Sequence, residues 1–541
     1  MQSPSYADAE AAAGPAGHGP EAQRAGRAGL RRRVLVPGAW VVGTAAAFAV
    51  YLRLAQTRAV NSDGASQALQ AWDLLHGNLL LRGWTVSDVS FYTTELPQYA
   101  LVELIRGLHA DVVTTCAAMT YTLAVLLAAL VAKGTSTGRQ GLLRVAVAAG
   151  IMLAPQLDSG TNVLLSSPDH IGTSVPLLLT WLVLDRGGRR WYIPVITSVL
   201  LSLAEVADSI AAVAGIIPLA LVCVVRAAWF ARQRRVRDVG YELALAGGAV
   251  AAAEAARSFL SAITTAGGFT VRPLGIQLAP LSAIFWHNLQ VTAQCLLLLF
   301  GANTGGPSTR EVTFFLLLHF AGVLLAAAGI AVAGWRIRRG GDLAVQVLLA
   351  AIAVNVSAFI VTNRAVDVTS AREIAPVLPF AAALAARQLS PALRPASRLL
   401  IVIGIGYVAG LGLELTAPAA PPQSALLTAW LERHHLGDAG LGGYWQANVV
   451  TLTSGGTVAI RPIADDGNGA GAERGEIEDA WFDPRRGAAH FVVLNPGDPE
   501  YPGYADYRGV RATWGNPARV YHVGQYTIWY WPTNLLATIR H

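Results

Sequence analysis

The chain has 541 residues, of which 53% are hydrophobic and only 14% are charged, and its mean hydropathy is +0.44. A soluble globular protein carries about 25% charged residues, so this composition excludes that class and indicates a polytopic membrane protein. The net charge of +6 comes almost wholly from arginines in short clusters between apolar segments, which is typical of membrane topology rather than of a nucleic-acid-binding face. The three cysteines, each within or beside an apolar run, exclude a disulfide framework and a cysteine zinc site.

Residues 1–33 are rich in Ala, Gly and Pro and end in three arginines, which predicts a disordered cytoplasmic tail. The apolar run 34–54 that follows has about the 20 residues needed to cross a bilayer. Ala47-Phe48-Ala49 resembles a signal-peptidase site, but the apolar run continues beyond it, which favours an uncleaved anchor.

The arginine clusters predict the topology, because loops on the cytoplasmic side are enriched in Arg and Lys. With the tail inside, residues 34–416 form a transmembrane domain whose first loop, 57–111, is exported. Residues 274–306 are apolar enough for a further span, but a crossing there would export the arginines at 336–339, so we expect an interfacial or re-entrant helix. About eleven spans result: 34–54, 112–132, 145–157, 171–184, 192–207, 210–230, 241–260, 312–335, 344–361, 374–386 and 399–415.

The remaining segment, 417–541, is predicted to be a small exported α/β domain. It contains a helix at 428–436 and β-like runs at 491–494 and 526–531. Residues 448–454 and 457–462, separated by two glycines, are interpreted as a β-hairpin, and 465–476 as a mobile loop. The predicted fold class is therefore mainly α, a polytopic helical membrane protein with a small C-terminal α/β domain.

Residues 61–106 are the first long polar stretch after a span, and they concentrate carboxylates. Their apolar spacing predicts an amphipathic helix over Gly64–Leu75, a turn at 76–78 and a second helix that starts near Pro97. Asp63 stands at the entrance of the first helix. As an alternative to a catalytic role, Ser62 or Asp63 could simply be the N-cap of that helix.

The pattern of this stretch resembles the first exported loop of the GT-C glycosyltransferases, in particular the branch of protein O-mannosyltransferases and lipid A aminoarabinose transferases. The residues that carry the resemblance are Asp63, Ala68, Leu74-Leu75-His76-Gly77-Asn78, Trp84 and Phe91-Tyr92-Thr93-Thr94-Glu95-Leu96-Pro97-Gln98. The resemblance implies an inverting transfer of a sugar from a polyprenyl-phosphate donor to a lipid, glycan or protein acceptor, on the outer face of the cytoplasmic membrane. Many members have Lys-Pro-Pro or His-Pro-Pro where this chain has Glu95-Leu96-Pro97, so a phosphate-binding cation must come from elsewhere.

Such a transfer needs a carboxylate to take the acceptor's proton and a cation to stabilise the departing phosphate. Asp63 is the candidate base. For the phosphate we expect Arg372 and Arg364, because an outer loop with two arginines departs from the charge rule. A salt bridge with Asp367 or Glu373 is the alternative, and Arg257 and Arg272 are further candidates.

A second group of candidates lies in the predicted outer turn around Asp169 and His170. The resemblance implies that an acidic residue here, Asp169, joins Asp63 at the catalytic site, either coordinating a divalent ion or orienting the acceptor. Glu95 and His170 are further candidates for positioning the acceptor or donor. A divalent cation, Mg²⁺ or Mn²⁺, could be held by Asp63, Asp169 and His170. Asp169 and His170 are competent oxygen and nitrogen ligands, but two ligands do not define a metal site. The alternative for Asp169 is a Pro-Asp helix start.

Two other functions stay open at this level. A chain of the same architecture that has lost catalysis could serve as an envelope scaffold, and a transporter is also compatible with many spans, although the sequence shows no internal repeat. Glu205 and Asp208 are interpreted as a solvated turn. The C-terminal tryptophans at 445, 481, 514, 529 and 531 could stack on sugars or form the core of the domain.

Overall fold

The computed structural model describes residues 20–153, 155, 159–273, 275–303, 310–337, 341–421, 424–437, 439–465, 469–495 and 506–539. The chain divides into two compact units, Met1–Ala49 and Val50–His541. In the first unit the described residues belong to helix α1 (Pro20–Ala55). Of the predicted tail, residues 1–19 lie outside the described residues, whereas 20–33 form the start of α1.

A helix lies at each of the eleven predicted spans. Within the described residues, seven helical stretches are long and apolar enough to cross a membrane: 38–55, 111–133, 212–232, 236–265, 315–336, 343–361 and 397–414. The chain is therefore a helical membrane protein, as predicted. The helices are α1, α4 (Asp111–Lys133), α5 (Gly138–Ile151), α7 (Ser174–Gly187), α8 (Ile193–Ala207), η2 with α9 (Ala212–Ile216, Ile217–Arg232), α10 (Val236–Thr265), α13 (Arg310–Arg336), α14 (Leu343–Val361), α15 (Val377–Leu393) and α16 (Ser397–Glu414).

The segment predicted to be interfacial or re-entrant is helical and packs beside the loop that follows α14. It forms α11 (Leu281–Ala283), η3 (Ile284–Asn288) and α12 (Leu289–Leu299), and α12 contacts η5 (Val368–Ile374). The side-chain amide of Asn288 donates to the carbonyls of Ile360 and Thr362 at 2.7 and 2.9 Å. These bonds satisfy carbonyls at the end of α14 and fix where the outgoing loop begins.

The first loop folds as its spacing predicts. Helix α2 (Ser62–Leu75) and helix α3 (Glu95–Arg106) flank strand β1 (Trp84–Val86). Alanines on one face of α2, such as Ala65 and Ala68, are fully buried in a cluster with Leu96 and Tyr99 of α3. Small residues on α2 let the two helices approach, and this packing fixes the start of α2 against the bundle.

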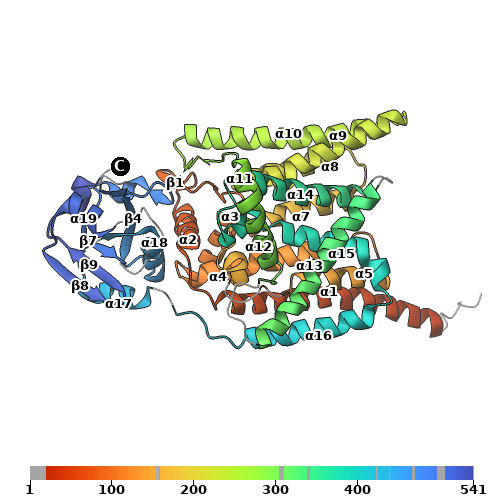
Figure 1. Cartoon of the computed structure of the whole chain (residues 1–541), viewed down its shortest axis with the longest axis horizontal. Coiled ribbons are helices and arrows are strands. Elements are labelled where there is room, and N and C mark those ends of the chain that lie inside the picture. The colour runs from red at the N-terminus through yellow and green to blue at the C-terminus, as the bar shows by residue number, and fades with distance from the viewer. Residues whose placement is uncertain are drawn as a thin grey trace, which may run out of the picture. The chain divides into compact units, whose positions relative to one another are not determined.

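The C-terminal region is an α/β unit built on a six-stranded sheet of order β5-β4-β3-β7-β9-β8, with β3 parallel to β4 and β7 and the other pairs antiparallel. Figure 1 shows these strands gathered with α17 and α18. The bounds are α17 (Ala425–His434), β3 (Ala439–Gly442), α18 (Tyr444–Thr453), β4 (Ala459–Asp465), β5 (Ala470–Ala472), η6 (Asp479–Phe482), β7 (Ala489–Leu494), α19 (Tyr507–Trp514), β8 (Arg519–Val523), β9 (Tyr526–Tyr530) and η7 (Leu535–Thr538).

The predicted β-hairpin at 448–462 is wrong, because its first arm belongs to helix α18. Every residue from 447 to 452 is buried, since α18 packs against β4 on one side and α2 on the other. Burial on both sides outweighs the β propensity of this valine- and threonine-rich stretch. Gly455 and Gly456, expected as the hairpin turn, have φ of 61° and 84° and terminate the helix instead.

A second, three-stranded sheet joins three distant parts of the chain. Strand β1 of the first loop pairs in parallel with β2 (Thr270–Val271), which follows α10. On its other edge β1 pairs antiparallel with β6 (Ile477–Glu478) of the C-terminal region. The predicted mobile loop 465–476 leads into β6 and contains β5, while its residues 466–468 lie outside the described residues. The sheet therefore holds the C-terminal region against the first loop.

Candidate functional site

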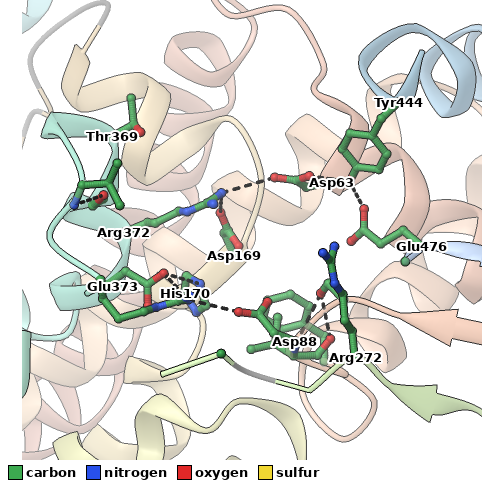
Figure 2. A pocket seen from close by; sticks show the side chains of 18 of the residues that line it. Asp63, Asp88, Asp169, His170, Arg272, Thr369, Arg372, Glu373, Tyr444 and Glu476 are labelled. Carbon is green, nitrogen blue, oxygen red and sulfur yellow. Dashed lines mark hydrogen bonds and ion pairs between the residues drawn. The ribbon is translucent and has the colours of Figure 1, made fainter. Parts of the chain in front are cut away.

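A cavity of about 580 Å³ opens where the first loop, the η5 loop and the C-terminal region meet. Figure 2 shows charged side chains from these separate segments pointing toward one another. Carboxylates outnumber guanidinium groups in its lining, so the cavity is strongly polar. The acidic residues are Asp63, Asp88, Asp169, Asp367, Glu373, Glu473 and Glu476, and the basic ones are Arg272, Arg364 and Arg372.

Arg372 lies between the two predicted catalytic carboxylates. Its guanidinium is 3.4 Å from Asp63 and 3.8 Å from Asp169, as Figure 2 shows. The neighbouring carboxylates, that of Asp169 foremost, raise the pKa of Arg372 further above its ordinary value. Its side chain nevertheless stays 45% exposed. The guanidinium is therefore charged, loosely held and accessible from the cavity.

Asp63 reaches this position because another residue caps its helix. The N-cap is Asn61, whose side chain accepts a hydrogen bond from the Gly64 amide at 2.9 Å, so the carboxylate of Asp63 is left free for the cavity. A Cβ at Gly64 would lie 2.5 Å from Val113 and 3.2 Å from Ser167. The glycine thus lets the start of α2 approach α4 and the turn that carries Asp169.

The environment of Asp63 raises its pKa to about 6. Burial is the main cause, and Arg372 opposes it by favouring the charged form, while the nearby Asp169 and Asp88 add to the rise. A carboxyl with this pKa is ionised at neutral pH and still basic enough to accept a proton, which is the range suited to a general base.

The turn around Asp169 combines the predicted helix start with a contact to the cavity. Pro168 occupies the N-cap position of the short helix η1 (Asp169–Ile171), so the Pro-Asp interpretation holds locally. Asp169 itself has φ of 39°, in the left-handed region that non-glycine residues seldom adopt. Backbone strain of this kind is concentrated at functional sites. The carboxylate of Asp169 faces Arg372, while the backbone continues into the bundle.

His170 forms a buried pair with Asp208. The ring Nδ1 is 2.9 Å from the Asp208 carboxylate, which also accepts from Thr173 and from the Ile210 amide. Burial alone would lower the pKa of His170, but Asp208 and Glu373 outweigh it and raise that pKa to about 10. The interpretation of Asp208 as a solvated turn is wrong, because this carboxylate is 1% exposed and fixes the imidazole.

The two predicted phosphate ligands differ. Arg364 is paired with Asp88 at 3.0 Å and with Glu373 at 2.6 Å, so the salt-bridge alternative holds for this residue. Arg372 is instead drawn to Asp63 and Asp169. Of the further candidates, Arg272 lines the cavity, whereas Arg257 does not belong to its lining and pairs with Glu254 on the surface.

Glu95 does not belong to the residues that line the cavity. It is 2% exposed, accepts a hydrogen bond from Thr94, and burial raises its pKa to about 8. Its carboxyl packs directly on Gly172, where any Cβ would collide with it. A positioning role for Glu95 would therefore act through η1, which carries Asp169 and His170.

Among the lining residues that escaped sequence analysis, Tyr444 and Glu476 of the C-terminal region lie beside Asp63. The Tyr444 hydroxyl lies 2.5 Å from Asp63 and also contacts the carboxyl of Glu476 (Figure 2). Tyr444 opens α18, and Glu476 immediately precedes β6. Packing of α18 on α2 brings Tyr444 here and pairing of β6 with β1 brings Glu476, in each case across several hundred residues of sequence, so local sequence patterns carry no signal for either residue.

Gln67, one turn beyond Asp63 on α2, also lines the cavity. Its side chain is 1% exposed, and neither its amide nitrogen nor its amide oxygen has a hydrogen-bond partner among the described residues. A buried amide without partners costs about 1–3 kcal/mol, so native proteins seldom keep one without a reason. A ligand in the cavity would supply the missing partners.

The fit of a metal ion can be judged from the same contacts. Among the described residues, no three or more His, Cys, Asp and Glu side chains come together as a group that could hold one. The Arg372 guanidinium lies between Asp63 and Asp169, and His170 directs Nδ1 to Asp208. A cation between the two aspartates would have to displace Arg372, so this arrangement does not fit a resident metal.

Comparison with known proteins finds neither a matching family model nor a matching curated protein. Among solved structures, the chain is similar to the oligosaccharyltransferase of Archaeoglobus fulgidus in complex with Zn and sulfate, with 14% identity, a TM-score of 0.48, and coverage of 83% of this chain and 67% of that one. That enzyme belongs to the GT-C family that the first loop resembles.

Proposed function

We propose that this protein is a glycosyltransferase that moves a sugar from a polyprenyl-phosphate donor to an envelope acceptor, at the outer face of the cytoplasmic membrane. The observation that carries the proposal is the convergence of Asp63, Asp169 and Arg372 on one cavity. These residues come from three segments of a membrane protein, and convergence of base and cation is what the reaction requires.

Asp63 would act as the general base. With a pKa of about 6, it is ionised at neutral pH and can take the proton of an acceptor hydroxyl as that oxygen attacks the anomeric carbon. A single displacement of this kind inverts the anomeric configuration. Asp169, whose carboxylate lies 3.8 Å from the same guanidinium, would orient the acceptor or the guanidinium.

Arg372 would stabilise the departing phosphate. A guanidinium offers a planar set of donors that matches phosphate oxygens, and this one is accessible while Arg364 is already engaged by two carboxylates. Arg272, which also lines the cavity, is available as a second cation. This chain would therefore need no basic residue before Pro97, where many GT-C enzymes carry one.

The lipid chain of the donor has a candidate path beside the cavity. A second pocket of about 160 Å³ shares His170, Arg364 and Glu373 with the main one. Its other lining residues are mostly apolar, among them Ile210, Val213, Ile276, Ala358 and Phe359. An isoprenoid could lie against these side chains, near the ends of α14 and η2, with its phosphate directed toward the arginines.

The test uses the purified full-length protein in lipid nanodiscs, supplied with a panel of labelled polyprenyl-phosphate sugars and an envelope extract as acceptor. We expect lipid-dependent sugar transfer by the wild type and a loss of about 10²–10⁴-fold in Asp63→Asn. The matched control is Asp111→Asn, in the same loop but engaged by Arg106 at 3.0 Å, which should keep wild-type turnover.

Folded wild-type protein that turns over none of these donors, or an Asp63→Asn variant with full activity, would contradict the proposal. A folded, inactive protein whose deletion still alters the envelope would instead favour the scaffold. Because Arg372 occupies the position where a metal would bind, chelation of divalent cations should leave the transfer rate unchanged. If chelation lowers the rate and Mg²⁺ or Mn²⁺ restores it, a metal replaces Arg372 between the aspartates.

A further inference from the structure

Tyr444 stands between two carboxyl groups. Its hydroxyl contacts Oδ1 of Asp63 at 2.5 Å and, on the other side, the carboxyl of Glu476. A phenol has one proton to donate, and two ionised carboxylates can only accept. One of the two carboxyls must therefore carry a proton and donate it to the phenol oxygen.

The surroundings distinguish the two acids. The second oxygen of Asp63 faces the Arg372 guanidinium, which favours the charged form. Glu476 forms no ion pair in the described part of the chain and is 6% exposed. Burial raises the pKa of Glu476 well above its ordinary value, and Asp63, Asp169 and Asp88 add to the rise while Arg372 opposes it. Glu476 is therefore the neutral acid, and Asp63 the carboxylate.

The fold holds both partners against α2. The Ser62 hydroxyl donates to the main-chain carbonyl of Tyr444 at 2.6 Å, so adjacent residues of α2 bind the backbone and the side chain of one tyrosine. Glu476 has φ of 56°, in the left-handed region that residues with a side chain seldom adopt. Pairing of the next residue, Ile477, with β1 holds it there.

We propose that Tyr444 and Glu476 are positioning residues for the base, forming a hydrogen-bond chain from neutral Glu476 through Tyr444 to ionised Asp63. The proposal rests on the function of Asp63 proposed above and assigns the C-terminal region a direct part in that chemistry. With Oδ1 bound to Tyr444 and Oδ2 near Arg372, the carboxylate is held ionised and in one orientation. A donor that itself accepts a hydrogen bond is polarised, which strengthens its bond to Asp63.

Three substitutions separate this arrangement from its alternatives. Tyr444→Phe removes the donor to Asp63, Glu476→Leu removes the donor to Tyr444, and Glu476→Gln keeps a neutral donor of similar shape. The charged groups that face Asp63 and Glu476, namely Arg372, Asp169, Asp88 and His170, stay in place in all three. The control is Tyr92→Phe, whose hydroxyl bonds Leu79 at 2.6 Å in the same loop.

The readout is the acid limb of kcat/KM against pH, with melting curves to confirm folding. A hydrogen bond to a charged group contributes about 1.5–3 kcal/mol, so its loss in Tyr444→Phe should move the limb upward by about one pH unit or more. Glu476→Leu should move it in the same direction by less, while Glu476→Gln and Tyr92→Phe should leave it in place. A downward shift in Glu476→Gln, as expected from removing a negative charge, or an unmoved limb in Tyr444→Phe would overturn the proposal.

Infrared difference spectra supply a measurement that does not depend on turnover. Wild-type protein at pH 7 should show a protonated carboxyl band that Glu476→Gln lacks and Tyr444→Phe shifts. If the band behaves in this way but the wild type transfers no sugar, the proposed function fails while the neutral state of Glu476 stands. If transfer is observed and Glu476→Gln removes no band, the hydrogen-bond chain is wrong and the proposed function survives.

Discussion

Two arginines of this protein each lie near two aspartates, and they differ in how completely they are engaged. Arg387 on α15 is 4% exposed, contacts Asp185 and Asp342 at 2.5 Å each, and donates to the Val131 carbonyl at 2.7 Å. Arg372 is 45% exposed and lies 3.4 and 3.8 Å from its aspartates. Arg387 ties α15 to α4, α7 and the start of α14, whereas Arg372 keeps donor capacity beside a cavity.

The exposure of an arginine and the lengths of its ion pairs thus distinguish a structural ion pair from a ligand-binding residue. A buried charge is tolerated when its partners satisfy it fully, and removing one partner then costs stability. A charge that stays accessible contributes little to the fold and is available to a ligand. Arg372 is such a charge, and the nearby Gln67 amide has no partner in the described part of the chain. Activity should therefore depend on Arg372 and stability on Arg387.

The largest expected effect is on activity. Arg372→Ala should lower kcat by about 10²–10³-fold, the usual loss when one preorganised donor to developing charge is removed. Its free energy of unfolding should change by less than about 1 kcal/mol, because the side chain is exposed and its ion pairs are long. Turnover and chemical unfolding of the same preparation measure both. If Arg372→Ala and Arg387→Ala lose the same stability, the two arginines do not differ in their contribution to the fold.

Arg387→Ala should show the reverse pattern. Breaking a buried ion pair leaves Asp185 as an uncompensated charge and costs about 3–5 kcal/mol of stability. The turnover of the molecules that remain folded should match the wild type, because α15 contributes no residue to the cavity lining. Denaturant titration, with activity normalised to the folded fraction, tests this, and a specific loss of activity would place Arg387 in the reaction.

The pH dependence should follow Asp63. Its pKa of about 6 predicts that kcat/KM falls about tenfold per pH unit below that value, because the protonated acid cannot accept the acceptor's proton. Since Arg372 lowers this pKa, Arg372→Gln should move the acid limb upward, whereas Arg387→Gln should not move it. A profile that is flat between pH 5 and 8 would argue against Asp63 as the base.

The buried pair of His170 and Asp208 gives a pH-dependent stability. The pKa of His170 is raised to about 10 in the folded protein, above the ordinary value of about 6.5, so the folded state binds the proton more tightly. This contribution is fully present below about pH 6.5 and is lost as pH rises toward 10. The wild type should lose stability over that window, and His170→Gln should lose less, as melting temperatures in a pH series would show.

The smallest effect is expected at Gln67. Gln67→Leu should leave stability unchanged or raise it by about 1 kcal/mol, because it removes two buried polar atoms that have no partner among the residues described. It should raise KM for donor or acceptor by about tenfold. The matched control is Gln70→Leu on the same helix, where the amide bonds Ser66 at 3.1 Å. That change should lower stability and leave KM alone. If Gln67→Leu lowers stability and leaves KM unchanged, Gln67 is a structural core residue.

The sequence was a good guide wherever the signal is local. Apolar length and arginine placement predict a helix at each span, and the spacing in 61–106 predicts α2 and α3. The GT-C resemblance of the first loop points to Asp63 and Asp169, and the presence of two arginines in one outer loop points to Arg372. The packing of the bundle brings the three side chains together.

What the sequence could not show depends on contacts between distant segments. Tyr444 and Glu476 enter the cavity through α18 packing on α2 and through two residue pairs between β1 and β6, and such short strands have no periodicity to detect. Asp208 looked like a solvated turn because its buried partner, His170, lies 38 residues away. In α18, burial against both β4 and α2 reverses a local preference for strand.

The most direct test of the central claim is a cryo-EM structure of the Asp63→Asn variant in nanodiscs with a bound polyprenyl-phosphate sugar. We expect the phosphate in contact with the Arg372 guanidinium, the sugar beside residue 63, and the first isoprene units along the pocket lined by Ile210 and Phe359. A donor bound elsewhere on the protein, with Arg372 still held between residue 63 and Asp169, would contradict the account.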